Sequence, residues 1–275
     1  MSNHLHMAQH WGYAMTSKLN LLKTSAFYLL CSMLTLKSAT ADTLIASNYN
    51  AKMDGDNKVV AIYGNSYTHY NNNLNTRLRD LTRSLLPNRA KGYSYRGITI
   101  SSGRLGWHEG NLQFQNTLKN WDVVVFQGNS TEPISKKTSS REYFQKSAQT
   151  MSKIAHEAGS KVVYFMTWAP KAHPELMDSL EKAYNQIAQD TGGYVAPVGL
   201  AFRNAQRQYP DIELYFVDGK HPSLAGTYLA ANVFFATLYN QSPIGGAVPQ
   251  GSDMDKETAE KLQRIAWETV QLYQE

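Results

Sequence analysis

Residues 64–68 read Gly-Asn-Ser-Tyr-Thr and directly follow a short β-branched run. A serine in a sharp strand-to-helix turn is exposed at the edge of a sheet, and its N–H lies near a helix N-terminus, where a developing negative charge is stabilised. Ser66 is therefore a candidate nucleophile. Taken alone, the segment favours a serine that caps the next helix. It is not a G-x-S-x-G elbow, because Thr68 occupies the last position.

Residues 218–223 read DGKHPS and hold the parts of an acid–base pair. Pro222 biases His221 away from helical geometry and suits the first position of a following helix. Asp218 can bend back through Gly219 to one nitrogen of the His221 ring, which leaves the other nitrogen free to take a proton. The alternative is a surface turn before a capped helix. Residues 218–223 are more specific evidence than residues 64–68, because Asp218, Gly219, His221 and Pro222 all fit the task of holding a histidine base in a fixed loop before a helix.

Two further turns contain candidate donors to an oxyanion. Residues 101–106 include Gly103, where a backbone without a Cβ atom can approach a ligand closely. Residues 127–130 include Asn129, whose side-chain amide could donate a hydrogen bond, and Gln127 is a rival donor. Each segment by itself is equally compatible with an ordinary turn.

Together the four segments resemble the SGNH (GDSL-type) hydrolases. The Gly-Asn-Ser of residues 64–66 is similar to the GDS block of that family, and Gly103 resembles its oxyanion glycine. Gly128-Asn129 falls where the family has a G-x-N-D block, and residues 218–231 closely match its D-x-x-H block. Asn65, Gln127 and Ser130 depart from these blocks.

The resemblance implies a flavodoxin-like fold, an ester or O-acyl substrate and no cofactor. It implies Ser66 as the nucleophile, His221 as its base and Asp218 as the group that orients His221. The N–H groups of Ser66 and Gly103 and the Asn129 amide would form the oxyanion hole, with Gln127 as the alternative to Asn129. The bond to be cleaved is expected to be an ester or O-acyl bond, such as an O-acetyl, carbohydrate or lipid ester, and no metal is required.

The elements that must position these residues alternate between strand and helix. β-Branched runs predict buried strands at 58–63, 95–100, 121–126, 161–167 and 194–198. Between them, leucines at positions 74, 78, 81 and 85 show helical spacing, and similar stripes end near 118, 154 and 187. Repeated β-α units predict a parallel sheet between two helical layers, a three-layer α/β/α sandwich. The last helix should dock on it through Leu262, Ile265 and Tyr273.

The composition excludes several classes of protein. Three of the five net positive charges belong to Lys18, Lys23 and Lys37, with no acidic residue before position 42, which leaves +2 for residues 42–275. No basic stripe points to nucleic acid. Cys31 is the only cysteine and lies in the apolar run of the predicted signal segment. The mature chain would then contain no cysteine, which excludes a disulfide scaffold and a cysteine nucleophile. The oligomeric state is left open.

The first 41 residues have the features of a secretory signal. Lys18 and Lys23 precede an apolar run at 26–36, which ends in an A-x-A pattern that predicts cleavage between Ala41 and Asp42. The run is too short to span a bilayer comfortably. We therefore expect a periplasmic or extracellular protein without stable membrane insertion; a retained anchor is the alternative, and Met15 is favoured over Met1 as the start. Residues 42–57 form a lead-in, and residues 58–275 a single domain.

Four aromatic or imidazole side chains fall in predicted loops near the same sheet edge: Trp107, His108, Trp168 and His173. They could line an acyl or sugar pocket, or the tryptophans could be packing residues. Ser179 begins an S-x-x-K match, but it lies in a predicted helix with a solvated face. Two other functions remain open: a non-catalytic glycan-binding protein on a hydrolase fold, and a structural envelope protein whose turns only resemble the blocks.

Overall fold

Five parallel strands form the centre of the fold. The computed structural model describes residues 52–275, without the side chain of residue 90. The strand order is β2-β1-β3-β4-β5, and every neighbouring pair is parallel. Their bounds are β1 (Val59–Gly64), β2 (Ser94–Thr99), β3 (Val123–Phe126), β4 (Lys161–Phe165) and β5 (Tyr194–Ala196). The predicted α/β/α sandwich with a flavodoxin-like sheet is confirmed.

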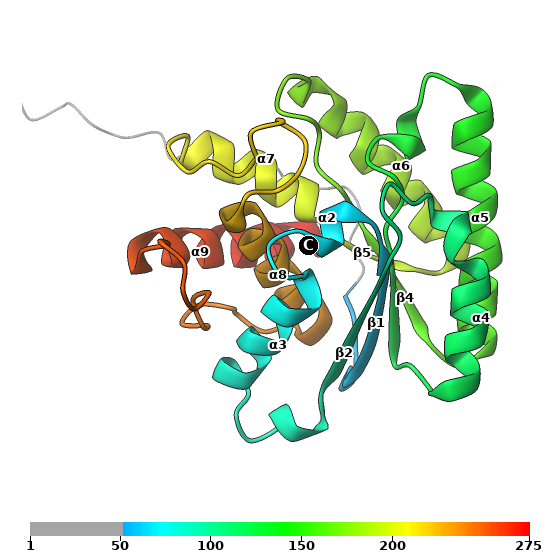
Figure 1. The fold of residues 1–275 in the computed structure, drawn as a ribbon, viewed down its shortest axis with the longest axis horizontal. Coiled ribbons are helices and arrows are strands. Elements are labelled where there is room, and N and C mark those ends of the chain that lie inside the picture. Colours follow the sequence, from blue (N-terminus) through cyan, green and yellow to red (C-terminus); the bar gives the residue numbers. More distant parts are fainter. Residues whose placement is uncertain (1–51) are drawn as a thin grey trace, which may run out of the picture. The chain divides into compact units, whose positions relative to one another are not determined.

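Helices cover both faces of this sheet, as Figure 1 shows. One face packs against α4 (Glu109–Leu118), α5 (Thr138–Glu157) and α6 (Met177–Thr191). The other packs against α3 (Leu74–Leu85), α7 (Val198–Gln208), α8 (Leu224–Tyr239) and α9 (Lys256–Tyr273). Alternate residues of one strand serve the two layers, since Ile62 packs on the second set and Tyr63 on the first. The predicted docking of the last helix on the sandwich is confirmed.

The structure differs from the predicted elements mainly after β4. The strand predicted at 194–198 ends at Ala196, because Pro197 directly precedes α7 and Val198 is already helical. Helix α7 has no counterpart among the predicted elements. Its apolar residues Val198, Ala201 and Ala205 have helical spacing and are buried. Only Pro197 separates β5 from α7, so the predicted strand ran on into the first residue of the helix.

Helix α8 is buried nearly all round and supports the loop that holds His221. Ser223 caps its N-terminus by accepting a hydrogen bond from the Gly226 N–H at 3.1 Å. The backbone of the preceding loop approaches this first turn so closely that a Cβ atom on Gly226 would lie 2.3 Å from the Leu214 carbonyl oxygen. Glycine at position 226 is therefore a condition for placing the loop against the helix.

The described residues fall within one compact unit, and no helix among them is long and apolar enough to cross a membrane. The predicted signal segment, its cleavage site and the alternative start sites lie outside residues 52–275. The single-domain prediction remains a prediction.

We predict opposite effects for two glycine-to-alanine changes in helical first turns. Gly226→Ala should lower the free energy of unfolding by about 1–3 kcal/mol, because the new methyl group overlaps a backbone oxygen that cannot move freely. Gly110→Ala should be neutral or raise it by about 0.5 kcal/mol, because a Cβ atom there meets nothing within 4 Å. Urea denaturation of the two variants measures both. Equal stability of the two variants would contradict the close approach at Gly226.

Candidate active site

Ser66, His221 and Asp218 form one continuous chain of hydrogen bonds. The Ser66 Oγ lies 2.9 Å from His221 Nε2, and His221 Nδ1 lies 2.5 Å from Asp218 Oδ2. Ser66 is the first residue of the short helix α2 (Ser66–His69), at the carboxyl end of β1. If the turns only resembled the blocks, as in a structural envelope protein, Ser66 and His221 would be expected to lie beyond the hydrogen-bond reach of about 3.2 Å. The 2.9 Å separation contradicts that alternative.

Asp218 is held as a carboxylate by its own turn. Its Oδ1 accepts hydrogen bonds from the N–H groups of Lys220 and His221, both at 2.9 Å, while Gly219 supplies the positive φ of +66° that the turn requires. Desolvation raises the pKa of Asp218, but the hydrogen bonds from the His221 ring and from these N–H groups lower it further, to about 2. The side chain is therefore an acceptor for His221 Nδ1–H over the physiological range.

Aromatic rings fix the orientation of the His221 ring. Tyr70 stacks on it with the centroids 4.3 Å apart and the planes inclined by 9°, and Tyr67 meets it edge-on at 5.5 Å. Phe216, in the loop before His221, packs edge-on against Tyr70. Tyr67 and Tyr70 belong to the segment that carries Ser66, so the same residues position both ends of the hydrogen bond. No motif in the sequence pointed to Tyr70.

Trp168 is a packing residue, which corrects its prediction as part of a substrate pocket. It is 1% exposed and is sandwiched between Tyr67 and Phe202, at centroid distances of 4.6 and 4.2 Å. Its Nε1–H donates to the Lys220 carbonyl at 2.9 Å. Trp168 thus joins the α2 segment to the loop that ends in His221, since its ring touches one and its indole N–H binds the other.

A run of three asparagines clamps the same loop from the other side. Asn71, Asn72 and Asn73 all have positive φ, between 54° and 68°, a conformation that asparagine tolerates better than most residues. The Asn71 Nδ2 lies 3.0 and 2.9 Å from the carbonyl oxygens of Pro222 and Ser223. The run Asn-Asn-Asn was the signal available in the sequence for this unusual turn.

Two buried side-chain amides tie together the loops that follow β1, β2 and β3. Asn65 Nδ2 donates to the carbonyls of Gly103 at 3.1 Å and Gly128 at 3.2 Å. Gln127 Nε2 donates to Asn65 Oδ1 at 2.6 Å and to the Gly128 carbonyl at 3.2 Å, and its Oε1 accepts from Thr68 Oγ1 at 2.6 Å. Because both N–H groups of this fully buried amide have partners, Gln127 is no free donor to a ligand. Its prediction as an oxyanion donor is wrong.

The structure explains why asparagine stands where the resembling block has aspartate. An ionised carboxylate at position 65 could accept from Gln127, but it could not donate to the two carbonyls that Asn65 now binds. Asn65 also caps α2, because its Oδ1 accepts from the Tyr67 N–H at 3.1 Å. Asn65 and Gln127 are thus matched to one another, and the sequence analysis missed the pair.

The three predicted oxyanion donors differ in their availability. Within the described residues the Ser66 N–H, at the start of α2, has no hydrogen-bond partner. The Gly103 N–H instead donates to the Ile100 carbonyl at 2.8 Å, which corrects the expectation of a free donor at this position. The Asn129 amide donates to the Ser102 carbonyl at 3.0 Å, which occupies one of its two N–H bonds and leaves its predicted role untested.

The remaining predicted pocket residues lie in three different environments. Trp107 is 53% exposed and borders a hollow of about 360 Å³ that Asn129 also lines. His108 is buried, and its Nε2 lies 2.9 Å from the Gly64 carbonyl oxygen. Burial lowers the pKa of His108, and the hydrogen bond to Gly64, which raises it, offsets this only in part. The neutral ring therefore donates to the backbone two residues before Ser66. His173 is exposed and pairs with Glu175. His108 and His173 do not line this hollow, and their role in a substrate pocket stays a prediction.

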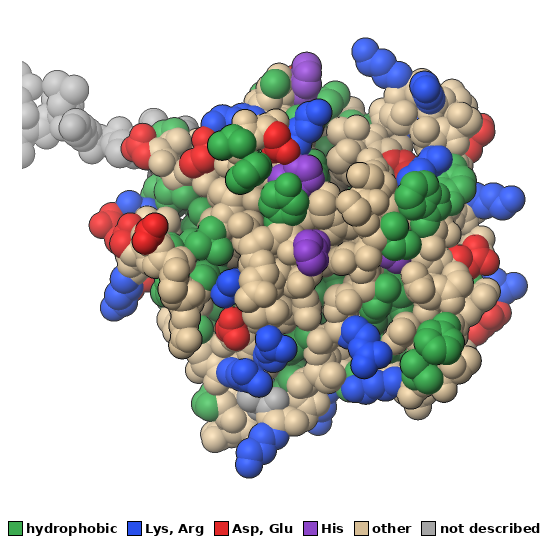
Figure 2. All heavy atoms as spheres, in the orientation of Figure 1, with side chains coloured by type: hydrophobic (Ala, Val, Ile, Leu, Met, Phe, Trp, Pro, Cys, Tyr) green, Lys and Arg blue, Asp and Glu red, His purple; other side chains and the backbone are tan. Residues whose placement is uncertain are grey.

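Within the part of the chain that the structure describes, no three histidine, cysteine, aspartate or glutamate side chains gather as a metal site would require. The site is built from hydrogen-bonding and proton-accepting groups. Figure 2 shows histidine side chains at the surface in the middle of the face above α2, with apolar side chains beside them. A histidine that is hydrogen-bonded to a serine on one side and to an aspartate on the other can remove the proton of the serine hydroxyl and return it to a leaving group.

We predict that Asn65→Asp is strongly destabilising despite its small change in size. The carboxylate would face two carbonyl oxygens that lose their donor, and an unsatisfied buried polar group costs about 1–3 kcal/mol, more when charged. Thermal or urea denaturation gives the loss in unfolding free energy. Asn120→Asp, an exposed position with the same change in charge, is the matched control and should stay within about 0.5 kcal/mol of wild type. Equal effects of the two changes would refute the role of the amide pair.

The lowered pKa of Asp218 predicts a pH-dependent contribution to stability. Since the folded-state pKa of about 2 lies below the ordinary value of 3.8, the contribution is fully present above about pH 4 and is lost as the pH falls towards 2. The difference in unfolding free energy between wild type and Asp218→Asn should shrink over that window. A difference that is constant from pH 7 to pH 2.5 would be inconsistent with a carboxylate held by His221.

Solved structures resemble this chain in sequence and in fold. A proposed SGNH hydrolase from Slackia heliotrinireducens is 30% identical, with 66% of this chain and 100% of that chain covered and a TM-score of 0.54. A DUF4886 family protein from Bacteroides uniformis is 17% identical, covering 78% and 95%, with a TM-score of 0.61. An acetylxylan esterase from Geobacillus stearothermophilus is 13% identical, covering 72% and 97%, with a TM-score of 0.55. The last two show the shared fold alone.

Comparison with protein-family models and with curated proteins gave no match. The relationship therefore stands on the solved structures, whose strand arrangement this chain shares, and on the identity to the Slackia protein over that protein's entire length. The resemblance of the four sequence segments points the same way. The chain belongs to the SGNH hydrolases.

Proposed function

We propose that this protein is a serine esterase that cleaves an ester or O-acyl bond through Ser66, His221 and Asp218. The Ser66 Oγ attacks the carbonyl carbon while His221 Nε2 takes the hydroxyl proton. Asp218 stabilises the imidazolium that forms and holds its Nδ1–H. The tetrahedral intermediate collapses, the carbon–oxygen bond to the alcohol breaks, and His221 gives the proton to the departing alcohol oxygen. An acyl-Ser66 enzyme remains.

Water completes the cycle. His221 Nε2 takes a proton from a water molecule as that water attacks the acyl carbon, and the proton then passes to the Ser66 Oγ as the carboxylic acid departs. The negative oxygen of both intermediates would be bound by the free Ser66 N–H and the Asn129 amide. One such donor contributes on the order of 10²–10³ in rate. Gly103 joins them only if its N–H leaves the Ile100 carbonyl.

The observation that carries this proposal is the unbroken Oγ–Nε2 and Nδ1–Oδ2 chain, at 2.9 and 2.5 Å. Support also comes from the packing of His221 between Tyr70 and Tyr67, because a base held in one orientation needs no reorganisation before proton transfer. Two proteins of the same fold carry the name acetyl xylan esterase or acetylxylan esterase, which supports O-acetyl groups as the first substrates to examine.

We further propose that the protein acts in the periplasm or outside the cell after cleavage between Ala41 and Asp42. The basic residues, the apolar run and the A-x-A pattern support this location. N-terminal sequencing of the protein from the culture medium or periplasm should begin at Asp42. A mature form that retains residues 26–36 would reverse this proposal in favour of an anchor.

Labelling with a fluorophosphonate probe tests the proposed nucleophile. Wild type should be labelled, and Ser66→Ala should lose both labelling and p-nitrophenyl acetate hydrolysis, the latter by roughly 10⁴-fold or more. Ser179→Ala is the matched control, because Ser179 is an exposed serine on α6 in an S-x-x-K context, and it should behave as wild type. If Ser66→Ala keeps its hydrolytic rate, Ser66 is not the nucleophile. If the wild type is neither labelled nor hydrolyses the ester, a non-catalytic glycan-binding role is the better explanation.

A further inference from the structure

A polar hollow lies beside the proposed catalytic serine. It is an open depression of about 360 Å³, bordered by two loop segments, one after β2 and one after β3, and by the first turn of α5. Its lining consists of Ser102, Arg104, Trp107, Asn129, Thr131, Glu132, Ser135 and Ser140. Seven of these eight side chains end in a hydroxyl, an amide or a charged group. A site for a long acyl chain would be lined mainly by apolar side chains.

The hollow is attached directly to the residue before Ser66. Asn65 donates to the carbonyls of Gly103 and Gly128, which begin the two walls. The Asn129 amide links the two walls, because it donates a hydrogen bond to the Ser102 carbonyl at 3.0 Å. The hollow thus lies on the face of the sheet that α4 and α5 cover, whereas the His221 loop leads into α8 on the opposite face.

An ion pair between half-buried Arg104 and buried Glu132 joins the two walls. The Glu132 side chain is 4% exposed, and its Oε1 accepts from Arg104 Nε at 2.5 Å while its Oε2 accepts from the Asn129 N–H at 3.2 Å. The Arg104 guanidinium also lies over the Tyr143 ring at 4.0 Å. Burying a carboxylate is costly unless it is paired and hydrogen-bonded. The pair keeps fixed donors and acceptors at the edge of the hollow.

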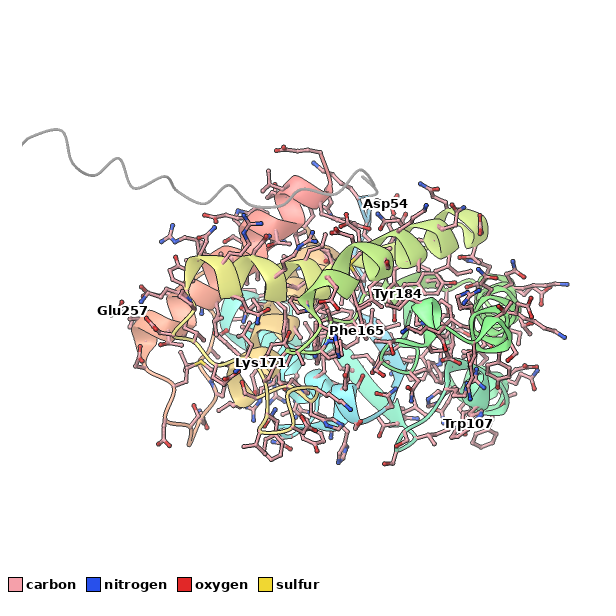
Figure 3. The ribbon with its side chains drawn as sticks, turned by 90° about the horizontal axis from the view of Figure 1, so that it is seen from above. Asp54, Trp107, Phe165, Lys171, Tyr184 and Glu257 are labelled. Atoms are coloured by element: carbon pink, nitrogen blue, oxygen red, sulfur yellow. The ribbon has the colours of Figure 1, made fainter. Side chains whose placement is uncertain are left out.

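Two further features indicate what such a hollow would bind. The hydroxyls of Ser102, Thr131 and Ser140 have no hydrogen-bond partner among the described residues, so they are available to a ligand. Trp107, on the short helix Leu105–His108, exposes 53% of its surface at the rim. Figure 3 shows Trp107 at the periphery of the molecule, at the opposite end from Glu257. A flat aromatic ring beside many hydroxyl and charged groups suits a ring-shaped ligand whose C–H groups can pack on the aromatic face while its hydroxyl groups bind to the polar walls.

We infer that the alcohol part of the substrate is a sugar, which lies in this hollow with one face on Trp107 and its hydroxyls on the polar walls. The inference rests on the proposed esterase function and specifies its substrate class as an O-acylated carbohydrate. Cleavage would leave the acyl group on Ser66 and release the sugar hydroxyl, which carries the proton from His221, into the hollow.

A different surface would serve a lipid. The loop tip at Phe216 and Val217 is apolar and exposed, 47% and 93% respectively, beside Tyr70 and His221. That tip presents two apolar side chains, whereas the hollow beside Trp107 presents seven polar or charged ones. The observations thus favour the sugar, and a preference for long acyl chains becomes an outcome that the test can return.

The test compares glucose pentaacetate with ethyl acetate, a small ester without a sugar or a ring, by titrating the acid released. We expect Trp107→Ala to lower the ratio of kcat/KM for glucose pentaacetate to kcat/KM for ethyl acetate by about tenfold, the scale of one lost aromatic contact. The change should lie mainly in KM for the sugar ester. Trp107→Phe should restore most of the ratio, because it keeps an aromatic face. Phe114→Ala is the matched control, since Phe114 is an exposed aromatic on α4 outside the hollow.

The outcomes separate the two proposals. Hydrolysis of both esters that depends on Ser66, with a ratio that Trp107→Ala leaves unchanged, would overturn the sugar site and keep the esterase. A wild-type preference for ethyl octanoate over both ethyl acetate and glucose pentaacetate would overturn it in favour of a lipid. Failure of Ser66→Ala to abolish ethyl acetate hydrolysis would instead overturn the esterase mechanism itself. Melting temperatures within a few degrees of wild type establish that the Trp107 and Phe114 variants are folded.

Discussion

Two buried amides, Asn65 and Gln127, hold the candidate site together. Parallel strands bring their carboxyl ends to one edge, but the loops that leave them diverge, and each loop exposes carbonyls and N–H groups that need partners. Asn65 satisfies carbonyls from both neighbouring loops while Gln127 satisfies Asn65. In a buried setting each of these hydrogen bonds is costly to leave unmade. The turn at Ser66 and the walls of the polar hollow therefore form one connected unit.

The same pair accounts for the departures of this chain from its family's usual blocks. Asparagine at position 65 and glutamine at position 127 look like two separate losses in the sequence. In the structure they are neighbours, 2.6 Å apart from Gln127 Nε2 to Asn65 Oδ1. A glycine at 64 is needed because a Cβ atom there would lie 2.5 Å from Gln127 Oε1. The substitutions are mutually compatible and preserve the turn that carries the proposed nucleophile.

The proposed base, His221, belongs to a loop far along the chain from Ser66. Aromatic side chains connect that loop to the turn that carries Ser66. Trp168 stacks on Tyr67 beside Ser66 and binds the Lys220 carbonyl beside His221. Tyr70 stacks on the His221 ring itself. Proton transfer depends steeply on distance and angle, so a loop that carries a base needs such supports. The supporting shell occupies more residues than the proposed triad, and most of them are buried.

The sequence by itself determined the layered α/β fold, because β-branched runs and leucine stripes at helical spacing leave few other arrangements. It also brought Ser66, Asp218 and His221 to attention, since the local chemistry of each turn is written in adjacent residues. Only the tertiary structure decided the rest. Trp168 became a buried support, Gln127 became a partner of Asn65, and Trp107 came to border a polar hollow. Those outcomes depend on contacts between residues dozens of positions apart, and the burial of a side chain follows from its neighbours in space.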